Sequence, residues 1–162
     1  MPMVTATLEG ATLRTVRRGL LLILLLGLAG IATELLFLNH DEEATQIIPL
    51  GLIAAAFVAV AWHGLRPGTA SVRVIQIVMA GLVVAGPLGM YYHYGANAEF
   101  QREMDPSIGG LALFWKVMAA KTPPALAPGS MSQLGLLGLA YAYRHPALAR
   151  GSSGRKKEDS AR

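Results

Sequence analysis

The hydrophobic positions of this chain form long blocks that short polar stretches separate. The first block, over residues 19–38, carries Glu34 as its single ionisable residue. A helix of about 20 apolar residues is about 30 Å long, which matches the hydrocarbon core of a bilayer. Further blocks cover about residues 45–65, 72–92 and 125–143. The pattern predicts four transmembrane helices within a membrane domain over 19–143.

A cleaved signal peptide is the alternative explanation for the first block. Residues 1–18 are polar and end in arginines, and the small residues Gly30 and Ala32 could suit a signal peptidase. The apolar block continues past these two residues, and three more blocks follow it. We therefore expect an uncleaved first helix after a cytoplasmic N-terminal segment over 1–18.

A shorter apolar segment over residues 108–120 lies between the last two blocks, after a polar connection over 93–107. Thirteen residues are too few to cross a bilayer, so we expect an extracytoplasmic helix that is amphipathic or re-entrant. Its apolar face is formed by Ile108, Leu111, Trp115 and Met118. The expected fold is an all-α, four-helix transmembrane bundle that carries this short helix between its third and fourth spans.

The charges predict which side of the membrane each connection faces. Charged residues make up 15% of the chain, well below the roughly 25% of soluble domains. Basic residues gather before the first block, after the second block, and in a tail over 144–162 that we expect to be disordered. By the positive-inside rule, we expect both termini to be cytoplasmic. The net charge of +4 is thereby explained by topology, and the expected partner is the lipid bilayer and not nucleic acid.

The sequence shows no catalytic pattern. Cysteine is absent, which excludes disulfides, thiolate metal sites, iron–sulfur clusters and cysteine nucleophiles. No serine stands in a G-x-S-x-G context, and no glycine-rich loop matches a nucleotide-binding fingerprint. We therefore expect a protein that is not an enzyme and has no catalytic residues.

We predict no cofactor, although the residues expected on the outer side are compatible with a divalent metal. His40, His93, Glu99 and Glu103 are all predicted on the outer surface, and imidazole with carboxylate suits several divalent metals. No HxxH, HxH or HExxH spacing supports the site, and histidines at helix ends are commonly interfacial. Haem would need the two histidines on facing helices at one depth, so we expect none. His63 and His145 are expected at the cytoplasmic interface, near lipid phosphates.

Glu34 is an intramembrane carboxyl about four residues from the outer end of its span. Such residues face protein or water by default because a charge in lipid is costly. One interpretation is a proton or cation site. The other is a carboxyl that is protonated, or is hydrogen-bonded to a neighbouring helix such as the one with Gln76 or the one with Gln133.

Small residues indicate where helices approach one another. The second span places Gly51, Ala55 and Ala59 on one stripe with His63, and the fourth span carries Gly135 and Gly138. Such stripes let helix backbones pack closely, although the second span is rich in alanine and the stripe can arise by chance.

A resemblance adds to these expectations. The stretch from HYGANAEF to AYAYRHP resembles part of a type of short bacterial multi-pass membrane protein, and the resemblance would cover about residues 30–148. It implies an inner-membrane location and carries over no ligand or catalytic residue. The small size, the small-residue packing stripes and the absence of catalytic spacing lead us to expect an accessory or assembly subunit, with a larger membrane protein or further copies as partner. The alternative is a small transporter or cation-handling protein that uses the outer histidines and carboxylates.

Overall fold

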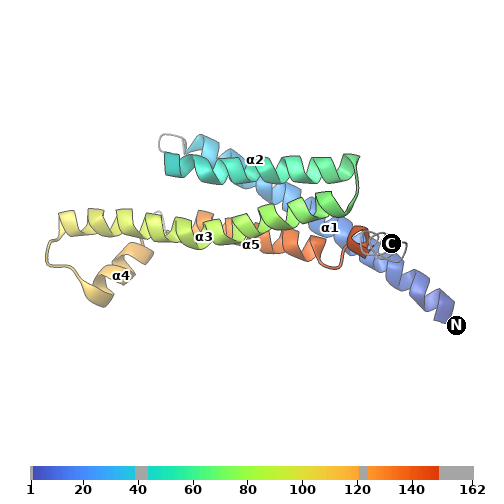
Figure 1. Cartoon of the computed structure of the whole chain (residues 1–162). Helices are drawn as coiled ribbons and strands as arrows, with labels where there is room; N and C mark the ends of the chain where they lie inside the picture. The colour runs from blue at the N-terminus through green and yellow to red at the C-terminus, as the bar shows by residue number, and fades with distance from the viewer. Residues whose placement is uncertain (1, 39–43, 121–123, 150–162) are drawn as a thin grey trace, which may run out of the picture.

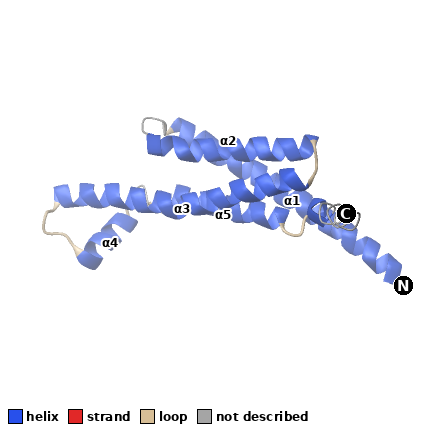
Figure 2. Ribbon diagram, in the orientation of Figure 1, coloured by secondary structure: helices blue, strands red, loops and turns tan. Residues whose placement is uncertain are grey.

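The computed structural model describes residues 2–38, 44–120 and 124–149, and in these ranges it contains helices and no strand (Figure 2). Five helices follow one another in this described part: α1 (Pro2–Phe37), α2 (Ala44–Leu65), α3 (Thr69–Met104), α4 (Gly110–Met118) and α5 (Leu126–Ala142). The predicted all-α class is confirmed.

Three of the helices are long and apolar enough to cross a membrane, over Glu9–Phe37, Gln46–Leu65 and Thr69–Met104. The chain is therefore a membrane protein with three apolar spans, as the first three hydrophobic blocks predict. α5 has 17 residues. A helix of this length measures about 25 Å, which is slightly less than the hydrocarbon core of a bilayer.

α3 is longer than the predicted third span. The hydrophobic block ends near Tyr92, whereas the helix continues to Met104 through a stretch expected as a polar connection. The reason is local: residues 96–104 are mostly good helix formers, and the single Gly95 costs only about 1 kcal/mol. A 36-residue helix measures about 54 Å, so α3 exceeds the thickness of a bilayer.

α3 is also the helix against which most of the others pack. α5 lies along it, α2 packs against it, and α1 contacts both α5 and α2 (Figure 1). Large apolar side chains fill the interior between these helices: Leu24, Leu28, Val72, Ile75, Met79 and Leu82. The outward surfaces are apolar as well, since Leu26, Val58 and Ile77 are 65%, 68% and 71% exposed. Helices that are apolar all round suit a lipid environment.

Glycines allow the close contact between α5 and α3. A Cβ on Gly135 would lie 2.6 Å from the backbone oxygen of Met79, and one on Gly138 would overlap the Met79 side chain. The α2 stripe is divided instead: Ala59 is buried, whereas Gly51 is exposed, and a Cβ placed on it would have no atom within 4 Å. Residues four apart advance by about 40° around a helix, so a stripe at this spacing leaves the packed face.

The C-terminal end of α3 and the short helix α4 form an arm, which we define as residues 94–118 (Figure 1). α4 is anchored by Leu113 and Val117, which are buried against Ala98 of α3. The chain enters α4 at Gly110 with φ of +55°, a conformation that favours glycine because other residues carry a Cβ.

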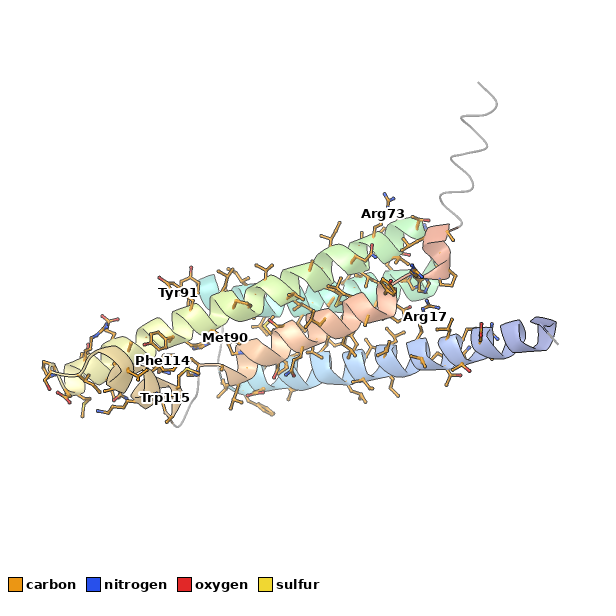
Figure 3. The ribbon with its side chains drawn as sticks, turned by 90° about the horizontal axis from the view of Figure 1, so that it is seen from below. Arg17, Arg73, Met90, Tyr91, Phe114 and Trp115 are labelled. Atoms are coloured by element: carbon orange, nitrogen blue, oxygen red, sulfur yellow. The ribbon has the colours of Figure 1, made fainter. Side chains whose placement is uncertain are left out.

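The apolar face predicted for the 108–120 segment is not the face that packs against α3. Leu111 and Trp115 are 71% and 62% exposed, and Figure 3 shows Phe114 and Trp115 on α4 at the end of the molecule. α4 is thus apolar on two sides. One side packs on α3 and the other is left uncovered by the described residues.

Candidate functional site

The predicted outer metal ligands are distributed along one helix. His40 lies outside the described residues, while His93, Glu99 and Glu103 all lie exposed on α3. Six positions separate His93 from Glu99, which corresponds to about 9 Å of rise and about 120° of rotation. Within the described ranges, no three His, Asp or Glu side chains are grouped so that they could hold a metal ion. The metal site therefore stays a prediction that depends on His40.

One cavity among the described residues lies beside His93 and has a volume of about 40 Å³. Apart from His93 its lining is apolar: Ile31, Leu35, Pro49, Ala85, Gly89, Ala127, Pro128 and Met131. Such a volume holds a few water molecules at most. It has no room for a solute-sized substrate.

A groove on the surface of the bundle between α1 and α5 carries polar side chains, and we call it the Glu34 groove. It has a volume of about 400 Å³ and is lined by Gly27, Gly30, Ile31, Glu34, Ser130, Gln133 and Leu134. The structure thus places Gln133, one of the two expected neighbours, beside Glu34 in the same groove. Both side chains are exposed, and neither has a hydrogen bond or ion pair in the described part of the chain.

A polar cluster with three buried and two half-buried members, which we call the basic-end cluster, lies at the opposite end of the bundle. It consists of Arg17 of α1, His63 of α2, Ser71 of α3, Tyr141 of α5, and His145 just beyond α5. His63 Nδ1 lies 2.8 Å from Ser71 Oγ. The His63 and His145 rings meet edge to face with centroids 5.0 Å apart, and the Tyr141 ring lies 6.3 Å from that of His63.

Ser71 has a structural role in this cluster. Its hydroxyl accepts a hydrogen bond from the backbone N–H of Gly68 at 3.2 Å and lies 3.0 Å from the Gly68 carbonyl oxygen. The side chain therefore closes the turn between α2 and α3 and satisfies a backbone donor at the start of α3. Because Ser71 is only 1% exposed, no substrate reaches it, and its contact with His63 is not a nucleophile–base pair.

The residues after α5 are held against the bundle. Arg17 Nη2 donates hydrogen bonds to the carbonyl oxygens of Tyr143 at 3.3 Å and Arg144 at 3.1 Å. Thr69 Oγ1 donates to the Ala147 carbonyl oxygen at 2.7 Å. The disordered tail was expected to begin at residue 144, but residues 144–149 fold onto the basic end. Carbonyl groups of the residues just beyond α5 thus find donors on α1 and α3.

The basic-end cluster was not predicted from the sequence. His63 and His145 were expected near lipid phosphates, whereas His63 is only 8% exposed and both rings lie against protein. One signal was present, because His63 follows the buried Ala59 by four residues and so lies on nearly the same side of α2. The contact with His145 depends on how α5 packs, which the sequence pattern does not reveal.

We expect acid to weaken the attachment of residues 144–149. His145 lies outside the spans, and burial, then the neighbouring His63 and Arg17, lowers its pKa below 6.5. The unfolded chain therefore binds this proton at a higher pH than the folded chain does. The resulting contribution to stability is present above pH 6.5 and is lost as the pH falls toward the folded-state pKa. Thermal unfolding in detergent between pH 8 and pH 5 measures this loss.

The control for this acid effect is a variant that lacks the titrating ring. His145→Phe keeps an aromatic side chain beside Tyr141 and should lose less thermal stability on acidification than the wild type does. An equal acid-induced loss in both proteins would contradict the role of His145.

The described residues thus provide two polar sites of different kinds. The basic-end cluster is centred on the buried His63, Ser71 and Tyr141 and joins helix ends, so it stabilises the fold. The Glu34 groove is open and has unpaired polar side chains, so it is available to a partner. No protein-family model, curated protein or solved structure matches this chain.

Proposed function

We propose that this protein is a non-enzymatic accessory subunit that binds a larger protein in a bacterial inner membrane. The observation that supports this is the arm, which extends past the bundle and exposes large apolar side chains: Phe100 57%, Met104 70%, Leu111 71%, Phe114 40% and Trp115 62%. Contiguous exposed apolar surface is typical of interaction sites, and aromatic residues are enriched there.

The apolar core of the described bundle supports the same proposal. Large apolar side chains occupy the space between the helices, and the described cavity beside His93 is only about 40 Å³. A transporter needs polar groups that face an internal pathway. In this protein Glu34 and Gln133, two polar side chains without a hydrogen bond in the described residues, are exposed on the surface of the bundle. These polar side chains are therefore placed to contact other molecules and not a solute inside the bundle.

We further propose that α5 is the fourth span and that the arm is extracytoplasmic. α5 lies along α3 and also contacts α1, so it shares their environment. Four spans place the basic connections and both termini on one side, which agrees with the positive-inside rule. The acidic residues of the arm, Glu99, Glu103 and Asp105, then face the other side.

Reporter fusions test this orientation. With four spans, alkaline phosphatase fused after Arg162 should be inactive because it stays in the cytoplasm, and a green fluorescent protein at the same place should fluoresce. A phosphatase fused after Ala120, before α5, should be exported and active. Active phosphatase after Arg162 would show that α5 does not cross the membrane.

Native-lipid extraction tests the accessory role. A tagged full-length chain, extracted with its surrounding lipid by a styrene–maleic acid copolymer, should carry one larger membrane protein in a fixed ratio. Trp115→Glu should abolish binding of the larger protein, because a carboxylate buried at the interface would be desolvated without a partner. Recovery of this chain alone, in any number of copies, would contradict the accessory role.

Two controls separate a protein partner from a lipid surface. Lys116→Glu changes the charge of α4 without altering its apolar side chains and should leave the bound protein in place. In a Trp62→Phe background, Trp115 is the remaining tryptophan, and brominated lipids should quench its fluorescence weakly if a protein covers it. Strong quenching would show that α4 lies on the bilayer instead.

A further inference from the structure

The Glu34 groove contains an uncompensated polar pair at the lipid-facing surface. Glu34 lies on α1 within the Glu9–Phe37 span, and Gln133 lies on α5 in the middle of that helix. Each is exposed, and neither has a hydrogen-bond partner among the described residues. A polar side chain in lipid without a partner is costly, so such residues usually face protein or water.

The groove carries a small residue that is open to an approaching backbone. Gly30 lines the groove, and a Cβ placed on it would have no atom within 4 Å. α1 and α5 lie side by side along the groove (Figure 3). Glycine on the surface of a transmembrane helix lets a second backbone approach closely, which strengthens hydrogen bonds between helices.

The tilt of the two polar side chains brings their polar ends toward a similar depth in the membrane. The side chains of a helix tilt toward its N-terminus. α1 and α5 run in opposite directions if α5 is the fourth span, so Glu34 tilts toward the middle of the bilayer and Gln133 tilts toward the outer side. Both line one groove, so a surface that reaches one of them at a given depth also reaches the other.

We propose that the Glu34 groove binds the same groove of a second copy of this chain. A two-fold axis along the membrane normal keeps both copies in one orientation and brings residues of equal depth together. Glu34 of each copy then meets Gln133 of the partner subunit. A carboxyl group accepts hydrogen bonds and a carboxamide both donates and accepts them, so the groove is complementary to itself.

A second copy satisfies the groove more fully than a foreign helix with one basic residue. Such a helix would pair with Glu34 and leave Gln133 unpaired. The two-fold arrangement pairs both side chains in both copies, because each copy supplies one carboxyl and one carboxamide. This dimer is a property of the membrane domain and does not require the accessory role proposed for the arm.

The monomer–dimer equilibrium of the purified full-length chain in lipid vesicles tests the proposal. Single-molecule photobleaching of labelled protein at increasing dilution in lipid gives the fraction of dimer. Glu34→Leu and Gln133→Leu should each weaken dimerisation about tenfold, since each removes both intersubunit hydrogen-bonded pairs. Glu34→Gln should retain the dimer, because two carboxamides can pair with each other.

The double variant gives the decisive comparison. If Glu34 pairs with Gln133 of the partner subunit, Glu34→Leu combined with Gln133→Leu should be no weaker than either single variant. Additive losses would show that the two residues act separately. A wild-type chain that stays monomeric at every lipid dilution would overturn the proposal, and so would equal dimerisation of all variants.

Crosslinking locates the interface on the groove. The chain has no cysteine, so a single introduced thiol reports one position. Gly30→Cys should give a linked dimer with a short bis-maleimide in membranes. Ile77→Cys, on the exposed surface of α3, should give none. Equal crosslinking at the two positions, or crosslinking at Ile77→Cys alone, would contradict the groove as the interface.

Discussion

Replacing Gly135 with leucine should prevent α5 from packing on α3. Even the Cβ of alanine would lie 2.6 Å from the Met79 carbonyl oxygen and 2.8 Å from the Val83 backbone nitrogen. These are backbone atoms, so they move only if the two helices separate. We expect Gly135→Ala to cost about 1–3 kcal/mol and Gly135→Leu to cost more. Unfolding of the purified protein by sodium dodecyl sulfate titration in mixed micelles measures both.

Gly51 provides the matched control for this effect. It lies on an apolar helix, as Gly135 does, but a Cβ placed there has no neighbour within 4 Å. Gly51→Leu should therefore leave stability within about 0.5 kcal/mol of the wild type, as surface substitutions usually do. If Gly51→Leu and Gly135→Leu destabilised the protein equally, the close contact of α5 with α3 would not be the cause.

Removing the hydroxyl of Ser71 should be the second large effect. Ser71→Ala leaves His63 Nδ1 without its partner at 2.8 Å and the Gly68 N–H without its acceptor at 3.2 Å. An unsatisfied buried polar group costs about 1–3 kcal/mol, and a lost helix cap about 1 kcal/mol. We therefore expect a total loss of about 2–4 kcal/mol, measured by the same titration.

A second substitution separates the two parts of this loss. In Ser71→Ala combined with His63→Phe, both partners of the buried hydrogen bond are apolar, so much of the destabilisation should be recovered. Ser107→Ala, which removes an exposed serine at the other end of α3, should cost little. A double variant as unstable as the sum of its single variants would show that the Ser71–His63 contact carries none of the loss.

Helix class and the first three spans were predictable because they depend on local composition. Blocks of about 20 apolar residues fold as helices in lipid wherever they occur. The end of α3 was not predictable from hydrophobicity, since the helix continues to Met104 on helix-forming polar residues. The two-sided apolar character of α4 was missed for a similar reason: the face with Leu111 and Trp115 dominates the pattern, yet Leu113 and Val117 make the contact with α3.

The sites were predictable only in part because they join distant segments. Glu34 stands out as the single ionisable residue of its block, and Gln133 was one of two helix neighbours that the sequence left open. The packing of α1 on α5, where Leu134 lies against Gly27, determines that Gln133 shares the groove with Glu34. The basic-end cluster depends likewise on contacts between α2 and residues beyond α5. No local pattern encodes such contacts.

The packing of α1 has a consequence for how the protein is made. α1 contacts α5 more extensively than it contacts α2, and Arg17 binds the carbonyl oxygens of Tyr143 and Arg144. At about 5–20 residues per second, the ribosome needs roughly 5–20 seconds to extend the chain from the end of α1 to the end of α5. During most of that interval α2 is the only one of its two helix partners that has been made, and the groove side of α1 that carries Glu34 lacks α5. A factor that shields nascent transmembrane helices would therefore be needed most by this protein before its last helix emerges.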